Sequence, residues 1–300
     1  MKVFLKDDIH EEARSKLIKY AEVIDDWKRL SEVDAIIVRK IQLDKKIFEY
    51  ADHLKVIGFH GSGINGIDLI EAKKHGIDVF TVPGLNAESV AELNIALALD
   101  VSHMLTWSAH EIKNGISMQD GLKRFRGHEM YCKTAGIIGM GAIGTLTAKK
   151  LQQGFSMNVI GFSRSFGSDK ASQLGIEAVG SIQDVLKKSD YVFLSLPYTQ
   201  ETYHIIGKTE LEMMKESAVL VNTARGKLVD EQALYQALKN HRIWGAASDV
   251  FETEPLDVHN PLIGLDNFLP TPHIGGNTEE ALYRVGMGVV DGILSRLKND

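Results

Sequence analysis

The chain has 300 residues, of which 44% are hydrophobic and 25% are charged, with a formal net charge of -6. This length suits two domains of ordinary globular composition, and the acidic balance gives no reason to expect nucleic acid or an anionic membrane as a partner. The single cysteine, Cys132, excludes an internal disulfide, and no metal site is expected. The charged start, MKVFLKDDIHEE, and the lack of an apolar run of about 18 residues predict a cytoplasmic protein.

The first third of the chain alternates short apolar strands with helical segments. Strands are expected at KVFL, EVID, AIIVR, KVIGF and DVFTV, with amphipathic segments such as DLIEAKKHG between them. Because parallel strands need crossover connections, this alternation predicts a parallel sheet with helices on both faces. After the break at Pro83 and Gly84, a long helix is expected from Glu88 past Leu105. The polar segment around 118–129 is typical of a connecting arm.

A second alternation follows. Strands are expected at TAGIIG, NVIGFS, YVFLSLP, AVLVNTA and IWGAASDVF, and helices at AIGTLTAKKLQQ, SIQDVLKKS, KTELEMMK and EQALYQALKN. This is the order of a doubly wound dinucleotide-binding fold. A final amphipathic helix has Asn277 or Thr278 as its N-cap. The predicted fold class is α/β, with two doubly wound parallel-sheet domains.

A glycine-rich turn joins the first strand and helix of this second alternation. Gly139, Gly141 and Gly144 supply a tight turn, close approach of backbone to a pyrophosphate, and close packing of helix on strand. Together with Ala142 and Ile143, they place backbone N–H groups and the positive end of a helix dipole where phosphates bind. The turn therefore predicts an NAD(P) site.

The next strand end predicts which dinucleotide binds. A site specific for NAD carries Asp or Glu about 20 residues after the glycines, where it hydrogen-bonds the ribose 2′-OH. Ser163, Arg164 and Ser165 stand there instead, and they offer a cation and two hydroxyls to a 2′-phosphate. NADP(H) is therefore the preferred cofactor, NAD(H) remains possible, and reduction is the expected direction.

Reactive side chains occupy three strand ends in the last third of the chain. Arg225 in NTARGKLVD suits a carboxylate, while Glu254 in SDVFETEP could pair with His273 in TPHIGGN. Ligands of open α/β sheets lie outside the carboxyl ends of the strands, so these residues are expected to converge. An arginine anchor with a histidine acid fits hydride transfer at a 2-oxo acid, because a neighbouring carboxylate keeps the imidazole protonated near neutrality.

At these positions the chain resembles the D-isomer-specific 2-hydroxyacid dehydrogenases. The matching blocks, in the family's order, are GFHGSGINGID, SVAELNIALAL, GMGAIG, LPYTQET, VNTARGKLVDEQAL, AASDVFETEP and TPHIGGNTEEA. The resemblance implies that Arg225, Glu254 and His273 are catalytic. It also implies cofactor contacts from Leu196, Pro197, Thr202, Thr223, Ala224, Asp249 and Gly275, and a grip on the substrate carboxylate by Ser62 and Gly63. FSRS is similar to the NADPH-preferring glyoxylate and hydroxypyruvate reductases of the family.

The resemblance further implies a discontinuous layout. A flavodoxin-like substrate domain would comprise residues 1–99 and 276–300, with a Rossmann domain of residues 100–275 inserted and a cleft that closes over substrate. A homodimer would form through the nucleotide domain, to which the arm contributes. Departures from the family pattern are His60 and Asn65 in HGSGIN, and Met140 and Ala142 in the glycine turn.

The favoured function is reduction of a small 2-oxo acid, glyoxylate- or hydroxypyruvate-like, to the D-2-hydroxy acid. A phosphoglycerate dehydrogenase-like biosynthetic enzyme is an alternative, because Arg39 at a strand end could meet an anionic substrate tail. A dinucleotide-sensing interaction protein, like the corepressors that share this fold, is the non-enzymatic alternative.

Overall fold

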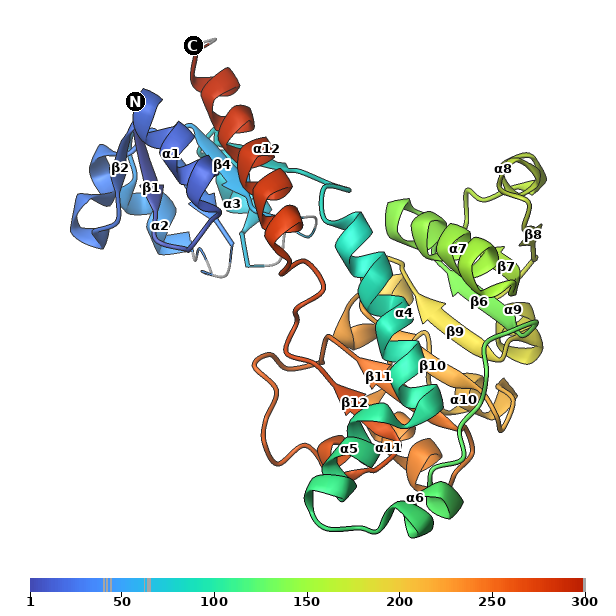
Figure 1. The fold of residues 1–300 in the computed structure, drawn as a ribbon. Helices are drawn as coiled ribbons and strands as arrows, with labels where there is room; N and C mark the ends of the chain where they lie inside the picture. Colours follow the sequence, from blue (N-terminus) through green and yellow to red (C-terminus); the bar gives the residue numbers. More distant parts are fainter. Residues whose placement is uncertain (40, 42, 44, 62, 64–65, 299–300) are drawn as a thin grey trace. The chain divides into compact units, whose positions relative to one another are not determined.

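The computed structural model describes residues 1–39, 41, 43, 45–61, 63 and 66–298. The chain divides into a first unit, Met1–Ser89 with Gly276–Asp300, and a second unit, Val90–Gly275 (Figure 1). The first boundary lies between Ser89 and Val90, whereas the sequence analysis placed it after residue 99. The reason lies in packing, because Leu97 and Val101 of the long helix are buried in the core of the second unit.

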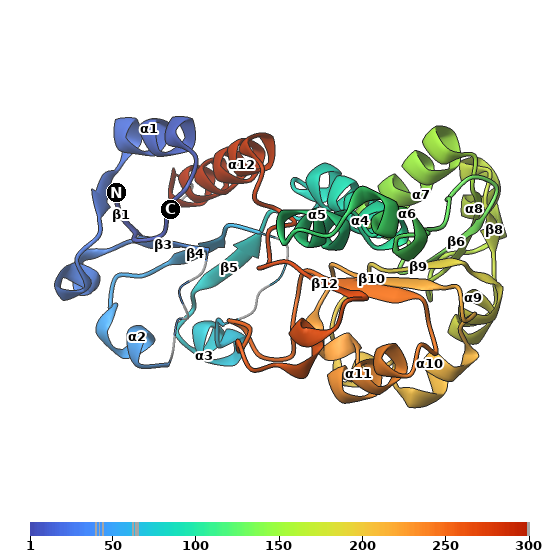
Figure 2. The same cartoon turned by 60° about the horizontal axis from the view of Figure 1, so that its bottom comes forward.

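The first unit is a five-stranded parallel sheet of order β2-β1-β3-β4-β5. Its strands are β1 (Lys2–Leu5), β2 (Glu22–Ile24), β3 (Ala35–Val38), β4 (Val56–Phe59) and β5 (Asp78–Thr81). Its helices are α1 (Glu11–Tyr20), α2 (Lys45–Tyr50), α3 (Leu69–Lys74), α12 (Glu279–Lys298) and the 3₁₀ helix η1 (Trp27–Glu32). Figure 2 shows α1 and α12 on one face of the sheet and α2 and α3 on the other. This strand order is the flavodoxin-like one, as predicted.

Helix α12 completes the first unit although it lies after the second unit in the sequence. Val285, Val289 and Ile293 are fully buried in the same cluster as Leu17 of α1. Thr278 Oγ1 accepts the Ala281 N–H at 3.3 Å, which confirms the expected N-cap.

The second unit is a seven-stranded sheet of order β12-β11-β10-β9-β6-β7-β8, and each neighbouring pair is parallel. Its strands are β6 (Thr134–Ile138), β7 (Asn158–Phe162), β8 (Glu177–Ala178), β9 (Tyr191–Leu194), β10 (Val219–Asn222), β11 (Gly245–Ser248) and β12 (Phe268–Pro270). The order reverses between β6 and β9, as in a Rossmann fold with one added strand. The predicted Rossmann topology is confirmed.

Helices cover both faces of this sheet (Figure 2). They are α4 (Ala87–His103), α5 (Leu105–Lys113), α6 (Met118–Arg124), α7 (Ala142–Phe155), α8 (Ser168–Leu174), α9 (Ile182–Lys188), α10 (Lys208–Met213) and α11 (Glu231–Lys239). Short 3₁₀ helices are η2 (Gln200–Thr202), η3 (Gly226–Leu228) and η4 (Pro261–Gly264). Since all strands run the same way, the loops after β6, β7, β9, β10, β11 and β12 meet at one edge of the sheet.

One helical prediction was wrong. The expected continuous helix past Leu105 is interrupted at Met104, whose φ of 56° is left-handed. Asp100 explains the break, because its carboxylate accepts the Thr106 N–H at 2.9 Å and the Thr106 hydroxyl at 2.5 Å. This side chain thereby caps the start of α5. The arm that follows also contains helix α6.

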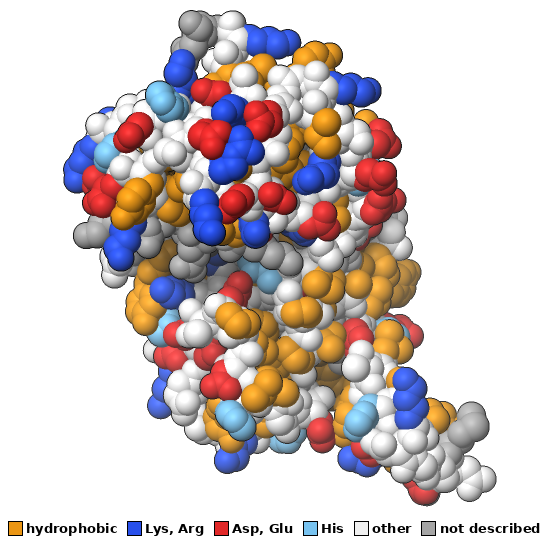
Figure 3. All heavy atoms as spheres, turned by 90° about the vertical axis from the view of Figure 1, so that its left-hand side faces the viewer, with side chains coloured by type: hydrophobic (Ala, Val, Ile, Leu, Met, Phe, Trp, Pro, Cys, Tyr) orange, Lys and Arg blue, Asp and Glu red, His pale blue; other side chains and the backbone are white. Residues whose placement is uncertain are grey.

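The face of the molecule in Figure 3 mixes basic and acidic side chains. Ion pairs between exposed side chains occur in the first unit, such as Arg29 with Glu22 at 2.7 Å and with Glu32 at 2.8 Å. Within the described part of the chain, none of the helices has the length and apolar character needed to cross a bilayer.

Candidate functional site

The glycine turn lies at the point where the strand order reverses. Gly139 has a φ of 104°, and a Cβ there would lie 2.4 Å from the carbonyl carbon and oxygen of Ser195, which follows β9. A Cβ at Gly144 would lie 2.0 Å from the Gly139 oxygen. Gly141, by contrast, has no neighbour within 4 Å of its Cβ position. The turn is therefore packed against the β9 loop on one side and open at Gly141.

The start of α7 fits the anionic part of a dinucleotide. Gly141 is its N-cap and offers no side-chain cap, and its first turn, which begins with Ala142 and Ile143, carries no acidic residue. The backbone N–H groups and the positive end of the helix dipole are thus available to phosphates. Nearby, the buried Ser195 Oγ has no hydrogen-bond partner among the described residues. These features fit a pyrophosphate held by backbone and hydroxyl groups.

The loop after β7 carries the predicted phosphate ligands. Phe166 N–H donates to the Ser163 carbonyl at 3.1 Å, which closes a turn with Arg164 and Ser165 exposed at its tip. Arg164 is not free, because its Nη1 lies 3.0 Å from Glu201 Oε2 of η2. The sequence analysis did not single out Glu201, although it stands next to Thr202 in the quoted block.

Hydrogen bonds of Thr202 organise the β9 loop. Its hydroxyl accepts the Thr199 N–H at 2.7 Å and donates to the Pro197 carbonyl at 3.0 Å. This holds Leu196 and Pro197 directly beside the glycine turn, since Ser195 is the residue against Gly139. The contact of Leu196, Pro197 and Thr202 with a cofactor stays a prediction.

The end of β10 is tied to two helices by a buried polar chain that the sequence analysis missed. Thr223 Oγ1 donates to Asn94 Oδ1 of α4 at 2.7 Å, and Asn94 Nδ2 donates to Thr147 Oγ1 of α7 at 3.1 Å. All three residues are buried. An asparagine within the apolar run VAELNIALAL was the available signal, because a buried amide needs partners. These hydrogen bonds hold Thr223 in place, directly ahead of Ala224 and Arg225 in the chain.

A compact turn presents Arg225. Asn222 Oδ1 accepts the Ala224 N–H at 3.1 Å, and Asn222 Nδ2 donates to the Arg225 carbonyl at 3.0 Å. Arg225 Nη1 donates to the Ala224 carbonyl at 2.6 Å. Burial lowers the pKa of Arg225, and the charge of Glu254 partly offsets this. The guanidinium remains a cation, since arginine does not deprotonate in proteins.

Gly226 explains how the β10 and β11 loops approach each other. A Cβ at this position would lie 1.9 Å from the Phe251 carbonyl carbon and 2.0 Å from its oxygen, so no other residue fits without moving the backbone. The Phe251 N–H in turn donates to Glu254 Oε1 at 3.0 Å. The turn that carries Arg225 and the segment that carries Glu254 therefore pack directly on one another.

Glu254 and His273 form the expected pair. His273 Nδ1 lies 2.8 Å from Glu254 Oε2. This hydrogen bond and the carboxylate charge raise the pKa of His273 against the opposing effects of burial and Arg225. Burial raises the pKa of Glu254, but bonds from His273 and the Phe251 N–H, with the charges of His273 and Arg225, bring the net pKa below its usual value. Glu254 thus interacts electrostatically with both His273 and Arg225.

Asp249 holds the loop that presents His273. Its Oδ1 accepts the Thr271 hydroxyl at 2.6 Å and the Ile274 N–H at 2.8 Å, and its Oδ2 accepts the Gly275 N–H at 2.8 Å. The charge of this buried carboxylate also raises the pKa of His273. Sequence analysis expected a cofactor contact from Asp249 and Gly275. In the structure they hold the 271–275 loop in place, and their contact with a cofactor stays a prediction.

The predicted substrate residues belong to the first unit. Arg39 follows β3, where its Nη1 donates to the Asp8 carbonyl at 3.2 Å and its Nη2 to Asn277 Oδ1 at 2.7 Å. Gly63 is partly buried, and Ser62 lies outside the described residues. Arg39 is therefore held at the carboxyl edge of the first sheet.

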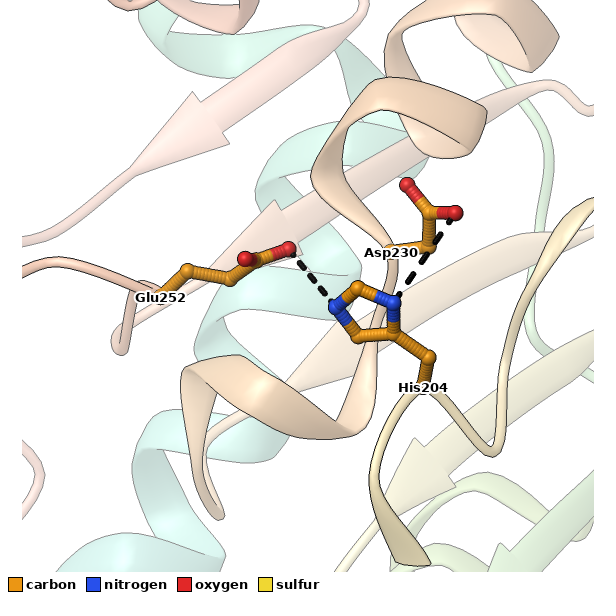
Figure 4. A group of neighbouring side chains, drawn as sticks. All are labelled: His204, Asp230 and Glu252. Carbon is orange, nitrogen blue, oxygen red and sulfur yellow. Dashed lines mark hydrogen bonds and ion pairs between the residues drawn. The ribbon is translucent and has the colours of Figure 1, made fainter.

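A second charged group stands beside the Arg225 turn. His204 Nε2 lies 3.0 Å from Glu252 Oε1, and His204 Nδ1 lies 4.0 Å from Asp230 Oδ2 (Figure 4). Its backbone N–H donates to the Lys227 carbonyl of η3 at 2.9 Å. The imidazole lies between the two carboxylates, and each carboxylate faces a different ring nitrogen. This group ties η3, the start of α11 and the β11 loop together.

Comparison with known proteins identifies the family of the chain. The model of the D-isomer specific 2-hydroxyacid dehydrogenase NAD binding domain matches residues 95–275. The chain belongs to this family. It is 37% identical over 309 residues to D-3-phosphoglycerate dehydrogenase of Methanocaldococcus jannaschii, an alignment that covers 100% of this chain and 58% of that protein. The chain thus spans a little over half of that relative's length.

Two further relatives match over nearly their whole length. Glyoxylate reductase of Korarchaeum cryptofilum is 33% identical over 310 residues, which cover 98% of this chain and 92% of that protein. The structure of an acyclic imino acid reductase in complex with NADPH and D-Arg superposes with a TM-score of 0.87 at 32% identity, covering 100% of this chain and 98% of that one. Membership of the 2-hydroxyacid dehydrogenase family accounts for the Rossmann unit and its glycine turn.

Proposed function

We propose that this chain is an NAD(P)-dependent D-2-hydroxyacid dehydrogenase that reduces a small 2-oxo acid to the D-2-hydroxy acid. The observation that carries the proposal is the His273–Glu254 pair at 2.8 Å, within reach of the buried charge of Arg225. Reduction of a ketone beside a carboxylate needs a protonated imidazole, a carboxylate that stabilises it and a charged arginine.

Each of the three side chains has a distinct task. Glu254 binds His273 Nδ1, which leaves Nε2 as the proton donor to the substrate oxygen. Arg225 pairs with the substrate carboxylate and polarises the ketone, and its partial burial strengthens both effects. A bound nicotinamide dinucleotide supplies the hydride. His273 is half-exposed, so it can be reprotonated from solvent after each turnover.

The cofactor site is assigned to the glycine turn and its neighbours. Gly139, Gly141 and Gly144 with the start of α7 hold the pyrophosphate, and the buried, unpartnered hydroxyl of Ser195 belongs to the residue that packs against Gly139. NADP(H) is the preferred form, because Arg164 is the charged group exposed at the end of β7. The imino acid reductase relative, solved with NADPH, supports this preference.

Glyoxylate- or hydroxypyruvate-like acids are the favoured substrates. The glyoxylate reductase relative, which aligns over 92% of its length, supports this class. A phosphoglycerate dehydrogenase-like activity is the second candidate, supported by the Methanocaldococcus relative and by Arg39 at the edge of the first sheet. Phosphorylated and unphosphorylated 2-oxo acids in one panel distinguish the two.

A homodimer is also proposed, formed through the arm of the second unit. Helix α6 exposes Leu122, whose relative accessibility is 81%, and α5 exposes Leu105 and Ile112. Beside α5 lies a hollow of about 260 Å³ lined by side chains that include Trp107 and Trp244. Exposed apolar residues next to an apolar hollow favour association with a second copy.

The test is a panel of 2-oxo acids assayed for oxidation of NADPH and NADH by the unmodified chain and its variants. His273→Ala should lower turnover at least about 100-fold, the usual scale of acid–base catalysis. Lys133→Ala, a change at an exposed lysine before β6, is the matched control and should leave turnover unchanged. Full turnover by His273→Ala would remove the proton donor from the proposal, and no oxidation with any acid would favour the non-enzymatic alternative.

A further inference from the structure

Arg164 and Glu201 join two loops that lie on either side of the glycine turn. Arg164 follows β7, and Glu201 belongs to η2 after β9. In the sheet, β6 lies between β7 and β9, so the turn that β6 feeds lies between these two loops. The ion pair of 3.0 Å therefore spans the edge of the crevice at which a dinucleotide is expected.

Both side chains of this pair are exposed, with relative accessibilities of 81% for Arg164 and 77% for Glu201. The backbone beneath Glu201 is nevertheless fixed, because Thr202 closes the loop through Thr199 and Pro197. The loop thus holds Glu201 near the end of β7, while the exposed side chain of Glu201 can still change rotamer. An exposed pair of this kind exchanges readily with another anion or donor.

We propose that Glu201 is a specificity-determining residue of the dinucleotide site, whose carboxylate occupies Arg164 and so weakens binding of a ribose 2′-phosphate. This inference rests on the proposed function. It follows that the carboxylate missing from the end of β7 is supplied by a different element, the loop after β9.

The two cofactors meet this pair differently. A 2′-phosphate must displace Glu201 from Arg164 and then remain close to the displaced carboxylate, whose like charge disfavours it. A ribose 2′-hydroxyl can donate a hydrogen bond to Glu201 while the ion pair stays in place. Arg164 thus favours binding of NADPH, whereas Glu201 disfavours it. The preference for NADPH over NADH is therefore weaker than Arg164 alone would produce.

The experiment compares Glu201→Gln with the unmodified chain. Dissociation constants for NADPH and NADH are measured without substrate by nicotinamide fluorescence, and those for adenosine 2′,5′-bisphosphate and 5′-AMP by calorimetry. Glutamine keeps the size of the side chain and removes its charge. The ratio of NADH to NADPH dissociation constants should rise about fivefold, the upper range for an exposed ion pair, and the gain should shrink in high salt.

Glu177→Gln is the matched control. Glu177 pairs with Lys188 at 3.0 Å, both side chains are exposed, and Glu177 begins β8, at the amino ends of the strands. Its replacement changes the net charge equally and should leave the cofactor ratio unchanged. Equal shifts for both cofactors in Glu201→Gln, or an equal change in the control, would overturn the inference and leave the proposed function standing. A chain that binds none of the four compounds would overturn both.

Discussion

His60 should make the first unit sensitive to acid. It follows β4 and is only 7% exposed, and its Nε2 has no hydrogen-bond partner among the described residues. Burial, together with the charge of Arg39, lowers its pKa from the ordinary 6.5 to about 4, although backbone bonds and Asp7 oppose this. The folded unit therefore holds a neutral imidazole over a pH range in which the unfolded chain holds a charged one.

The sign and size of the effect follow from proton linkage. Below pH 6.5, His60 binds a proton in the unfolded chain but not in the folded unit. The free energy of unfolding therefore falls as the pH drops from 6.5 to about 4. This interval of about 2.5 pH units at about 1.4 kcal/mol each gives a loss of about 3 kcal/mol at pH 4. Above pH 6.5 the residue contributes no such dependence.

The assay is urea unfolding of the unmodified chain and of His60→Leu, compared at pH 7 and pH 4. Trp27 belongs to the first unit, and its ring centroid lies 4.6 Å from that of buried Phe4, so its fluorescence reports unfolding of that unit once Trp107 and Trp244 are replaced by Phe. Between pH 7 and pH 4 the free energy of unfolding should fall by about 3 kcal/mol less in His60→Leu than in the unmodified chain. Carboxylates that titrate in both proteins cancel in this difference.

The same substitution at His53, an exposed histidine of the first unit, serves as the control. It should leave the pH dependence of unfolding close to that of the unmodified chain. If His60→Leu also left it unchanged to within about 1 kcal/mol, the imidazole would have to accept protons freely in the folded unit. The reasoning from its burial would then be refuted.

Two other predictions concern the active site and the arm. In Glu254→Gln the pKa of His273 should fall, because the hydrogen bond and the charge that stabilise the imidazolium are lost. The pH above which reduction fails should therefore be lower than in the unmodified chain. A pH profile of kcat/KM that does not move would contradict this. If the proposed dimer forms through α6, Leu122→Glu should shift it toward monomer in light scattering, because the change places a charge on an exposed apolar residue. A dimer that Leu122→Glu leaves unchanged would remove α6 from the interface.

The course of the chain could be predicted because strand and helix patterns are local. The alternation in both halves gave the two parallel sheets, and the strand ends then brought Arg225, Glu254 and His273 to one edge without knowledge of a single distance. The break at Met104 could not be foreseen in the same way. It depends on Asp100, whose carboxylate binds Thr106 six residues further on, in the first turn of α5, although the apolar pattern continues through this point.

Pairings between distant loops were beyond the sequence. Arg164 and Glu201 are 37 positions apart, and nothing local tells which carboxylate an exposed arginine will meet. Asp249 illustrates a different limit. Its position at a strand end was clear, but its two oxygens bind the Thr271 hydroxyl and backbone N–H groups of the same loop, and backbone partners leave no trace in residue identity.

The place of α12 in the chain sets an order for folding during synthesis. Val285, Val289 and Ile293 fill the core of the first unit, yet they leave the ribosome only after all of residues 90–275. The β-strands of the first unit are made early and remain with one apolar face covered only by α1, while the second unit can fold as soon as β12 emerges. The domain that begins the chain is therefore the second to finish, and its exposed sheet is the surface that a chaperone would have to protect in the interval.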